Sequence, residues 1–253
     1  MRPGDSDLAV LIDELSRTVP ELRARTAVTT RRQLYRVPCS ECLIGVIPGS
    51  IRQVRDVDIW VNSENTDFQM ARPTEFSVSA IIRYWGAFRD ETGRIVEDVI
   101  ADDLRARVGD RTPVAPGTAV VTGSGALRET HNVTKVIHVA AVQGEPGAGF
   151  RQVRNVEWCV TSTLAQAERI AGTGDARSVL FPMLGAGMAH ADLASTASVM
   201  VTGVLDHLSR HRDTLLQRVF LLGYNEAERA ALQSVLREAT TALEVRPDPP
   251  SGE

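Results

Sequence analysis

Residues 178–188, with the sequence SVLFPMLGAGM, contain a short apolar run that ends in a proline and a glycine-rich turn. The run 178–181 has the nearly continuous apolar character of a strand that is buried on both faces. After the turn, residues 191–209 carry an Ala-, Leu- and Val-rich face at helical spacing. A buried strand, a glycine turn and an amphipathic helix in this order predict one step of a parallel sheet covered by helices.

The same alternation of strand and helix patterns recurs along the chain. Short apolar runs predict strands at 43–47 (LIGVI), 57–61 (VDIWV), 119–121 (AVV), 135–142 (KVIHVAAV) and 218–222 (RVFLL). Helical patterns lie at 76–87, 96–107, 154–171 and 226–243. Strands that alternate with helices indicate βαβ units, so we expect an α/β fold with a mainly parallel sheet.

The length and composition favour one domain with additions. The chain has 253 residues, of which 43% are hydrophobic and 24% charged, which excludes wholesale disorder. Residues 1–42 are predicted to be a helical extension and connector, with an amphipathic helix over 5–25 and an edge strand or connector over 26–38. The main domain spans 43–243 and includes an insertion at 86–113. The polar, proline-rich tail 244–253 is expected to be disordered.

Charge and cysteine content exclude several classes of function. A net charge of −4 gives no strong field toward nucleic acid, so no direct nucleic-acid binding is expected. No apolar run is long enough to span a bilayer and no signal peptide is evident, so we expect a cytoplasmic protein without membrane contact. Cys39 and Cys42 form a lone C-x-x-C, and together with Cys159 they are too few for a disulfide framework or a four-ligand zinc site. We expect reduced thiols and no bound metal.

Polar and glycine-rich segments follow four of the predicted strands. These segments are Pro48–Ile51, Asn62–Asp67, Pro182–Met188 and Gly223–Asn225. Ligands of open α/β sheets bind outside the carboxyl ends of the strands. We therefore expect amide side chains, a glycine turn and an aromatic ring to converge there.

This combination of groups suits a nucleotide. Gly185 and Gly187 would let backbone N–H groups approach a phosphate, and the N-terminal end of the helix at 191–209 would add its positive dipole. Tyr224 offers a flat face to a nucleobase, and Asn62 and Asn65 can hydrogen-bond a ribose or a diphosphate. The LGAG stretch by itself is also typical of an ordinary strand-to-helix turn. The co-occurrence of the four segments favours a binding site.

These segments, in this order, resemble the macro domains, a family of α/β modules that bind ADP-ribose and related nucleotides. The segments that resemble family motifs, between about residues 43 and 240, are LIGVIPGSI, DVDIWVNSENT, PGTAVVTGSGAL with KVIHVAAV, SVLFPMLGAGMA, and RVFLLGYNEAERAAL. The resemblance implies a three-layer α/β/α fold with a mixed, mostly parallel sheet. It also implies a cleft for ADP-ribose or another NAD-derived nucleotide, with no cofactor.

Carried over residue by residue, the resemblance identifies a set of binding residues. Asn65 falls where hydrolases of the family hold the distal ribose, and Glu75 has the spacing of their catalytic acid. Glu75 is also suited to cap the next helix, since T-E-F-S precedes an apolar run. The ligand-binding residues are predicted to be Ser50, Ile51, Asn62, Asn65, Gly185, Ala186, Gly187, Met188, Tyr224 and Asn225.

The sequence departs from the family at two places. Ser50 stands where many members have an aspartate that reads the adenine amino group, and residues 68–73 (FQMARP) replace a glycine run. Phe68 and Pro73 are expected to change the shape of the loop that surrounds the distal ribose. We therefore expect a reader or sensor that passes its signal through the N-terminal segment or a protein partner. Hydrolysis of ADP-ribosyl bonds, with Glu75 and Asn65, is the alternative.

Two further interpretations, a redox enzyme and a catalytic histidine, have weaker support in the sequence. A redox Rossmann enzyme is disfavoured because GSGAL at 123–127 does not match G-x-G-x-x-G. His138 lies within an apolar strand, where a histidine is more often a satisfied structural residue than a catalytic base.

Overall fold

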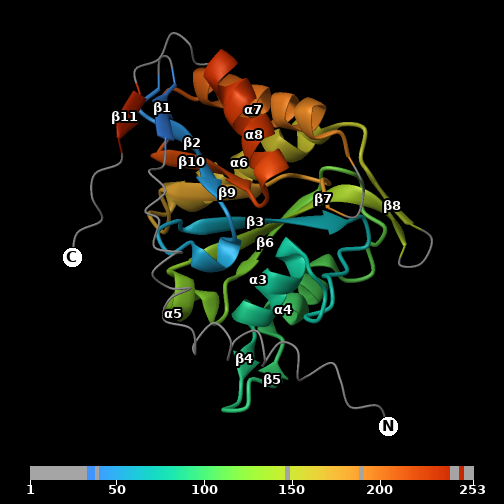
Figure 1. The fold of residues 1–253 in the computed structure, drawn as a ribbon. Coiled ribbons are helices and arrows are strands. Elements are labelled where there is room, and N and C mark those ends of the chain that lie inside the picture. The colour runs from blue at the N-terminus through green and yellow to red at the C-terminus, as the bar shows by residue number, and fades with distance from the viewer. Residues whose placement is uncertain (1–32, 38–39, 146–148, 188–190, 240–244, 248–253) are drawn as a thin grey trace.

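The computed structural model describes residues 33–37, 40–145, 149–187, 191–239 and 245–247. Its main sheet consists of β1 (Gln33–Arg36), β2 (Leu43–Pro48), β3 (Ile59–Asn65), β6 (Ala119–Gly123), β7 (Lys135–Glu145), β8 (Gly149–Gln152), β9 (Ser178–Pro182), β10 (Arg218–Gly223) and β11 (Val245–Pro247). The strand order is β11-β1-β2-β10-β9-β3-β7-β6, with β8 paired to β7 (Figure 1).

The five central strands, β2, β10, β9, β3 and β7, are parallel. In this sheet the antiparallel strands are the outer ones: β1 pairs with β2 and with β11, and β6 and β8 each pair with β7. This arrangement confirms the mixed, mostly parallel sheet. The strand expected at 57–61 begins at Ile59 and continues to Asn65, because Asn62, Ser63 and Glu64 keep the register with β7. Four of the six residues of the segment expected to be a polar loop, Asn62 to Asn65, are thus strand.

Helices cover both faces of the sheet and complete three layers (Figure 1). One face carries α3 (Val78–Gly86), α4 (Val99–Val108) and α5 (Leu127–His131). The other carries α6 (Val156–Gly172), α7 (Leu193–Arg210) and α8 (Glu226–Ala239). Successive side chains of β3 enter different cores, since Trp60 packs in the cluster that contains Ile82 of α3, whereas Val61 packs in the cluster that contains Val160 of α6.

The segment 86–113 consists of a hairpin followed by α4. The hairpin is formed by β4 (Phe88–Arg89) and β5 (Ile95–Glu97) and projects from the body (Figure 1). Its base is tied to α3, because the Arg89 guanidinium lies 4.6 Å from the ring centroids of both Tyr84 and Trp85. α4 packs against β6 at the edge of the sheet.

Both ends of the described chain add strands to the sheet. β1 lies between β2 and β11, so the edge strand expected within 26–38 is present over Gln33–Arg36 but is covered by a further strand. Val245–Pro247 form that outer strand within the segment expected to be disordered, because their backbone pairs with β1. The helix expected over 5–25 lies outside the described residues. No helix of the described part is both long enough and apolar enough for a transmembrane span.

Asp58 and Ser178 align the starts of β3 and β9. The Asp58 carboxylate accepts hydrogen bonds from the Arg177 N–H at 2.8 Å, the Ser178 N–H at 2.9 Å and the Ser178 hydroxyl at 2.7 Å. The Ser178 hydroxyl in turn accepts from the Asp58 N–H at 3.0 Å. Because the two strands run parallel, this link fixes their relative register at the start of the pair.

Candidate functional site

The carboxyl ends of the parallel strands meet at one edge of the sheet, and two hydrogen bonds join the segments that follow them. The Gly49 N–H donates to the Gly223 carbonyl at 2.9 Å and connects the ends of β2 and β10. The Gly185 N–H donates to the Ser63 hydroxyl at 3.3 Å and connects the turn after β9 to β3. From β2 to β3 this edge covers three strand spacings, about 14 Å.

Ser50 and Ile51 begin a short 3-10 helix, η1 (Ile51–Gln53), after β2. The Ser50 hydroxyl caps it by accepting from the Arg52 N–H at 3.3 Å. Ile51 is fully buried in the core, so its side chain does not reach the surface of this edge. Tyr224, at the end of the neighbouring strand β10, is 43% exposed and offers its ring at the surface.

Asn225 caps α8 together with Glu228. The Asn225 Oδ1 accepts from the Glu228 N–H at 2.9 Å, and its Nδ2 donates to the Glu228 Oε1 at 3.0 Å. The other carboxylate oxygen of Glu228 accepts from the Tyr224 N–H at 3.0 Å. Burial raises the pKa of Glu228 above its usual range. Glu228 was not among the predicted residues, although N-x-x-E before a helix is a capping signal that could have identified it.

The two glycines of the turn, which were both expected to present N–H groups to a phosphate, differ in their surroundings. Gly185 has a φ of +69°, a left-handed conformation that favours glycine. Its N–H group, predicted to approach a phosphate, donates to Ser63 instead. Gly187 is exposed, and a Cβ added there would meet nothing within 4 Å. Ala186 is half-buried between them, and Met188 lies outside the described residues.

The N-terminus of α7 is capped by a carboxylate side chain. Asp192 is the N-cap, and its Oδ1 accepts from the Ser195 N–H at 2.6 Å. A carboxylate at this position satisfies an N–H group and offsets the positive end of the helix dipole. The expectation that this helix end attracts a phosphate is therefore weakened by its acidic cap.

Asn62 lies in the protein interior rather than at the strand ends. Its side chain is fully buried on the α3 face of β3, where Nδ2 donates to the Glu64 carboxylate and lies 3.3 Å from the Ser79 hydroxyl and 3.4 Å from the His138 Nδ1. Strand alternation explains this placement, because Asn62 and Glu64 share a face with Trp60. A direct contact between its side chain and a ligand, as expected from the sequence, does not fit this burial.

His138 is a satisfied core residue, as the sequence indicates. Its Nδ1 lies 3.2 Å from the Glu64 Oε1, its Nε2 lies 3.0 Å from the Thr122 hydroxyl, and its side chain is fully buried. Ser79 links this polar cluster to the loop after β3, since its hydroxyl accepts from the Ala71 N–H at 3.1 Å.

Asn65 shapes the loop that follows β3. The register with β7 shifts between Glu64 and Asn65. Because of this shift, the side chain of Asn65 no longer follows the regular alternation between the two faces of the sheet. Its Oδ1 accepts from the Asp67 N–H at 2.9 Å and from the Gln69 N–H at 3.2 Å. Its Nδ2 donates to the Gln69 carbonyl at 3.3 Å. Asn65 is thus placed at the edge expected for a ribose, with its amide engaged in its own loop.

The residues that replace the family's glycine run are arranged around a buried phenylalanine. Phe68 has a φ of +50° and is 7% exposed, within the same apolar cluster as Ile81. Its ring therefore faces the core and does not lie on the surface of the loop. Glu75 is exposed, and Ser77 rather than Glu75 caps α3 by accepting from the Ala80 N–H at 3.1 Å.

Three residues that support the glycine turn were missed by sequence reasoning. They are Ser63, Gln152 and Thr196, which hydrogen-bond to the turn or to one another. Strand β8, which carries Gln152, was not predicted, because its four residues, GFRQ, carry no clear apolar alternation. Ser63 lies in the polar segment 62–67 that the sequence identified, and could have been included among its site residues.

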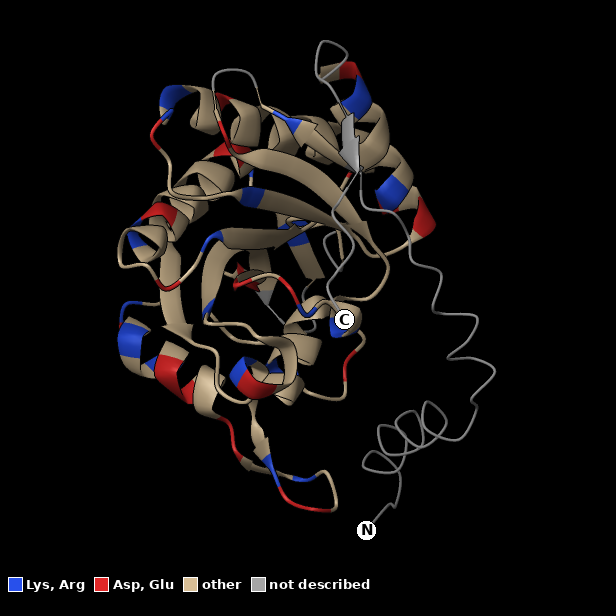
Figure 2. Ribbon diagram, turned by 90° about the vertical axis from the view of Figure 1, so that its left-hand side faces the viewer, with Lys and Arg blue, Asp and Glu red and all other residues tan. Residues whose placement is uncertain are grey.

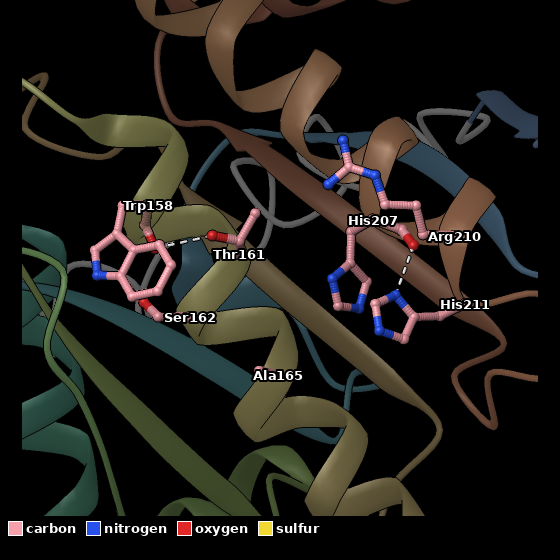
Figure 3. Close-up of a pocket in the computed structure, with 7 residues that line it drawn as sticks. All are labelled: Trp158, Thr161, Ser162, Ala165, His207, Arg210 and His211. Atoms are coloured by element: carbon pink, nitrogen blue, oxygen red, sulfur yellow. Dashed lines mark hydrogen bonds between the residues drawn. The ribbon is translucent and has the colours of Figure 1, made fainter.

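A groove of about 260 Å³ lies elsewhere, between α6 and α7 (Figure 3). Figure 3 shows Trp158 at one end and the His207 and His211 rings at the other, and these two rings stack with centroids 4.1 Å apart. No predicted site residue lines it. Acidic and basic residues are interspersed over the outer helices (Figure 2), in keeping with the modest net charge.

Comparisons with known proteins agree with the fold. Residues 86–200 match the family model described as Macro domain. No curated protein matches the sequence. The resemblance to the macro domains is thus supported by a sequence match over less than half of the chain, and that match begins at the first residue of the segment expected to be an insertion.

Solved macrodomains resemble most of this chain in fold. A macrodomain of Oceanobacillus iheyensis with MES bound has a TM-score of 0.61 at 12% identity, covering 83% of this chain and 98% of that one. Its G37V mutant with ADPR has a TM-score of 0.59 at 12% identity, with 82% and 98% covered. A Trypanosoma brucei macrodomain in complex with ADP-ribose has a TM-score of 0.57 at 14% identity, with 93% and 92% covered. These likenesses confirm the expected fold.

Proposed function

We propose that this chain, which has the macro-domain fold, binds ADP-ribose or a related NAD-derived nucleotide as a reader or sensor. The observation that carries the proposal is the pair of hydrogen bonds, Gly49 to Gly223 and Gly185 to Ser63, that brings Tyr224 and the glycine turn to one edge of the sheet. Two neighbours of the same fold are described with ADPR or ADP-ribose, which supports the choice of ligand.

Each part of the nucleotide has a counterpart along this edge. The exposed ring of Tyr224 offers a stacking face for the base, beside the Ser50 hydroxyl. The turn at 185–187 receives the diphosphate, where Gly187 leaves open space for close approach. The loop shaped by Asn65 receives the distal ribose. A site built on backbone and amide groups holds an anion without a basic surface.

Isothermal titration calorimetry with ADP-ribose tests the proposal. We expect one ligand per chain, and at least tenfold weaker binding by Gly187→Glu, because a carboxylate there would repel the diphosphate. Gly172→Glu is the matched control, since Gly172 is also exposed with nothing within 4 Å of a Cβ, but at the far end of α6. Absence of binding at millimolar ligand, or equal binding by the two variants, would contradict the proposal.

Hydrolysis of an ADP-ribosyl bond is the second candidate. It is favoured by the exposure of Glu75 in the loop after β3, together with the finding that Ser77 performs the capping role. In this mechanism the Glu75 carboxylate orients or activates a water molecule at the anomeric carbon, while the diphosphate contacts hold the ribose in place.

Release of ADP-ribose from a modified protein separates the two candidates. A hydrolase should lose most of its activity in Glu75→Gln but keep it in Glu91→Gln, an exposed glutamate of the β4–β5 hairpin. Equal, background-level release by the wild type and by Glu75→Gln would reject hydrolysis and leave the reader function.

We also infer a cytoplasmic location and a protein partner that binds through the N-terminal segment. The mild net charge of −4 is compatible with both, and residues 1–32 lie outside the described part of the chain. Cross-linking of the full chain in a cell lysate, with and without ADP-ribose, would show whether a partner is recruited in response to the ligand.

A further inference from the structure

Gln152, the last residue of β8, contacts the glycine turn at Leu184 and Gly185. Its Nε2 donates to the Leu184 carbonyl at 2.7 Å and to the Thr196 hydroxyl at 3.0 Å. The stem of the same side chain packs against Gly185, since a Cβ added to Gly185 would lie 2.7 Å from the Gln152 Cγ. One half-buried side chain thus contacts the turn by a hydrogen bond and by packing.

We propose that Gln152 is a positioning residue that fixes the glycine turn in the conformation that receives the diphosphate. This inference rests on the proposed function, because it assigns a role within the same site. The amide of Gln152 faces Leu184 and Thr196, so Gln152 acts on the ligand through the turn.

The turn needs such support because of its glycines. A glycine has more backbone freedom to lose than any other residue, so an unsupported glycine turn pays an entropic cost when it orders around a ligand. Two side chains on two different strands reduce this cost. Ser63 of β3 accepts from the Gly185 N–H, and Gln152 of β8 donates to the carbonyl of the preceding residue, Leu184.

Strand β7, which lies between β3 and β8, also supports the loop shaped by Asn65. Val142 of β7 is the register partner of both Asn65 on β3 and Gln152 on β8. The Val142 carbonyl accepts from the Thr66 N–H at 3.0 Å, at the start of the loop shaped by Asn65. Tyr224 instead follows β10, on the other side of β9. Loss of the Gln152 contact should therefore affect the diphosphate and leave the base contact unchanged.

Gln152→Met tests this prediction, because methionine keeps the length and packing of the stem but cannot donate to Leu184. We expect about tenfold weaker binding of ADP-ribose and of ADP, equivalent to about 1.4 kcal/mol, because the variant loses the hydrogen bonds to both Leu184 and Thr196. Binding of adenosine, which lacks the diphosphate, should be unchanged. Thr196→Val, which removes one of the two acceptors and leaves the Leu184 bond, should have a smaller effect.

Gln143→Met is the matched control, because Gln143 is a glutamine of the same hairpin, one residue along β7 from the partner of Gln152. Circular dichroism confirms that each variant is folded. If Gln152→Met does not fold, Gln152→Leu serves instead, since leucine is uncharged, fills part of the same space and cannot donate to Leu184.

The outcomes separate this inference from the proposed function. If the wild type does not bind ADP-ribose, the proposed function itself fails. If the wild type binds and the Gln152 variant binds equally well, the positioning role is overturned while the function stands. An equal loss of adenosine and ADP-ribose binding also overturns it, because the effect would then extend beyond the turn.

Discussion

Asn65 and Gln69 are joined by two reciprocal hydrogen bonds. The Gln69 N–H donates to the Asn65 Oδ1 at 3.2 Å, and the Asn65 Nδ2 donates to the Gln69 carbonyl at 3.3 Å. An asparagine side chain thereby closes the loop that stands in place of a glycine run. The amide that the sequence predicts to hold a ribose is also the group that gives this loop its shape.

Replacement of Asn65 by alanine should therefore loosen this loop as well as remove a ligand contact. We expect at least tenfold weaker ADP-ribose binding in Asn65→Ala, because the loop must then be ordered at the expense of binding energy. Asn65→Asp keeps both Oδ1 acceptor contacts and should lose less. Calorimetry compares the affinities, and unchanged binding by Asn65→Ala would show that this loop does not form part of the site.

Tyr224→Ala should weaken ADP-ribose binding by removing the exposed ring at the end of β10. Stacking of a base on an aromatic ring contributes about 1–3 kcal/mol, which corresponds to roughly 5- to 150-fold in affinity. Tyr224→Phe keeps the stacking face and should bind nearly as well as the wild type. If the alanine and phenylalanine variants bind alike, the ring does not stack on the base.

Asp192→Asn should strengthen binding of a diphosphate ligand. Asparagine still caps α7 by accepting from the Ser195 N–H, but it removes the negative charge at the helix N-terminus. We expect a gain of a fewfold in affinity that is larger at low ionic strength, because salt screens exposed charges. Titrations at two salt concentrations measure it, and a loss of affinity would indicate that the carboxylate itself supports the ligand.

His131 should make stability depend on pH. Burial, with a smaller effect of the Arg55 charge, lowers its pKa from 6.5 to about 4, although its hydrogen bond to the Arg52 carbonyl opposes the shift. Between these values the unfolded chain takes up a proton that the folded protein does not. The free energy of unfolding should therefore decrease as the pH falls from about 6.5 towards 4.

Urea denaturation between pH 7 and pH 5 measures this dependence. The decrease should be reduced in His131→Gln and retained in His211→Gln, where the histidine is exposed. The same decrease in both variants would assign it to other groups.

Much of the fold could be predicted, because the strong signals are local. The run LIGVI and the helix at 191–209 have periodicities that depend only on neighbours along the chain. The strands β4, β5, β8 and β11 were missed, because each has only two to four residues and their pairing depends on distant segments. Asn62 was expected in the loop after the strand at 57–61, but it is buried because β3 continues to Asn65 and strand alternation places Asn62 on the face of Trp60.

The sequence by itself determined the order of the central parallel strands and the larger helices, and hence the edge of the sheet where Tyr224, the glycine turn and Asn65 meet. Only the tertiary structure decided which side chains face that edge. Strand alternation buries Asn62, a register shift releases Asn65 into its loop, and Gln152 reaches the turn from a strand paired with β7. The physical reason is that propensity and periodicity act between neighbours in sequence, whereas register and packing join residues that are far apart along the chain.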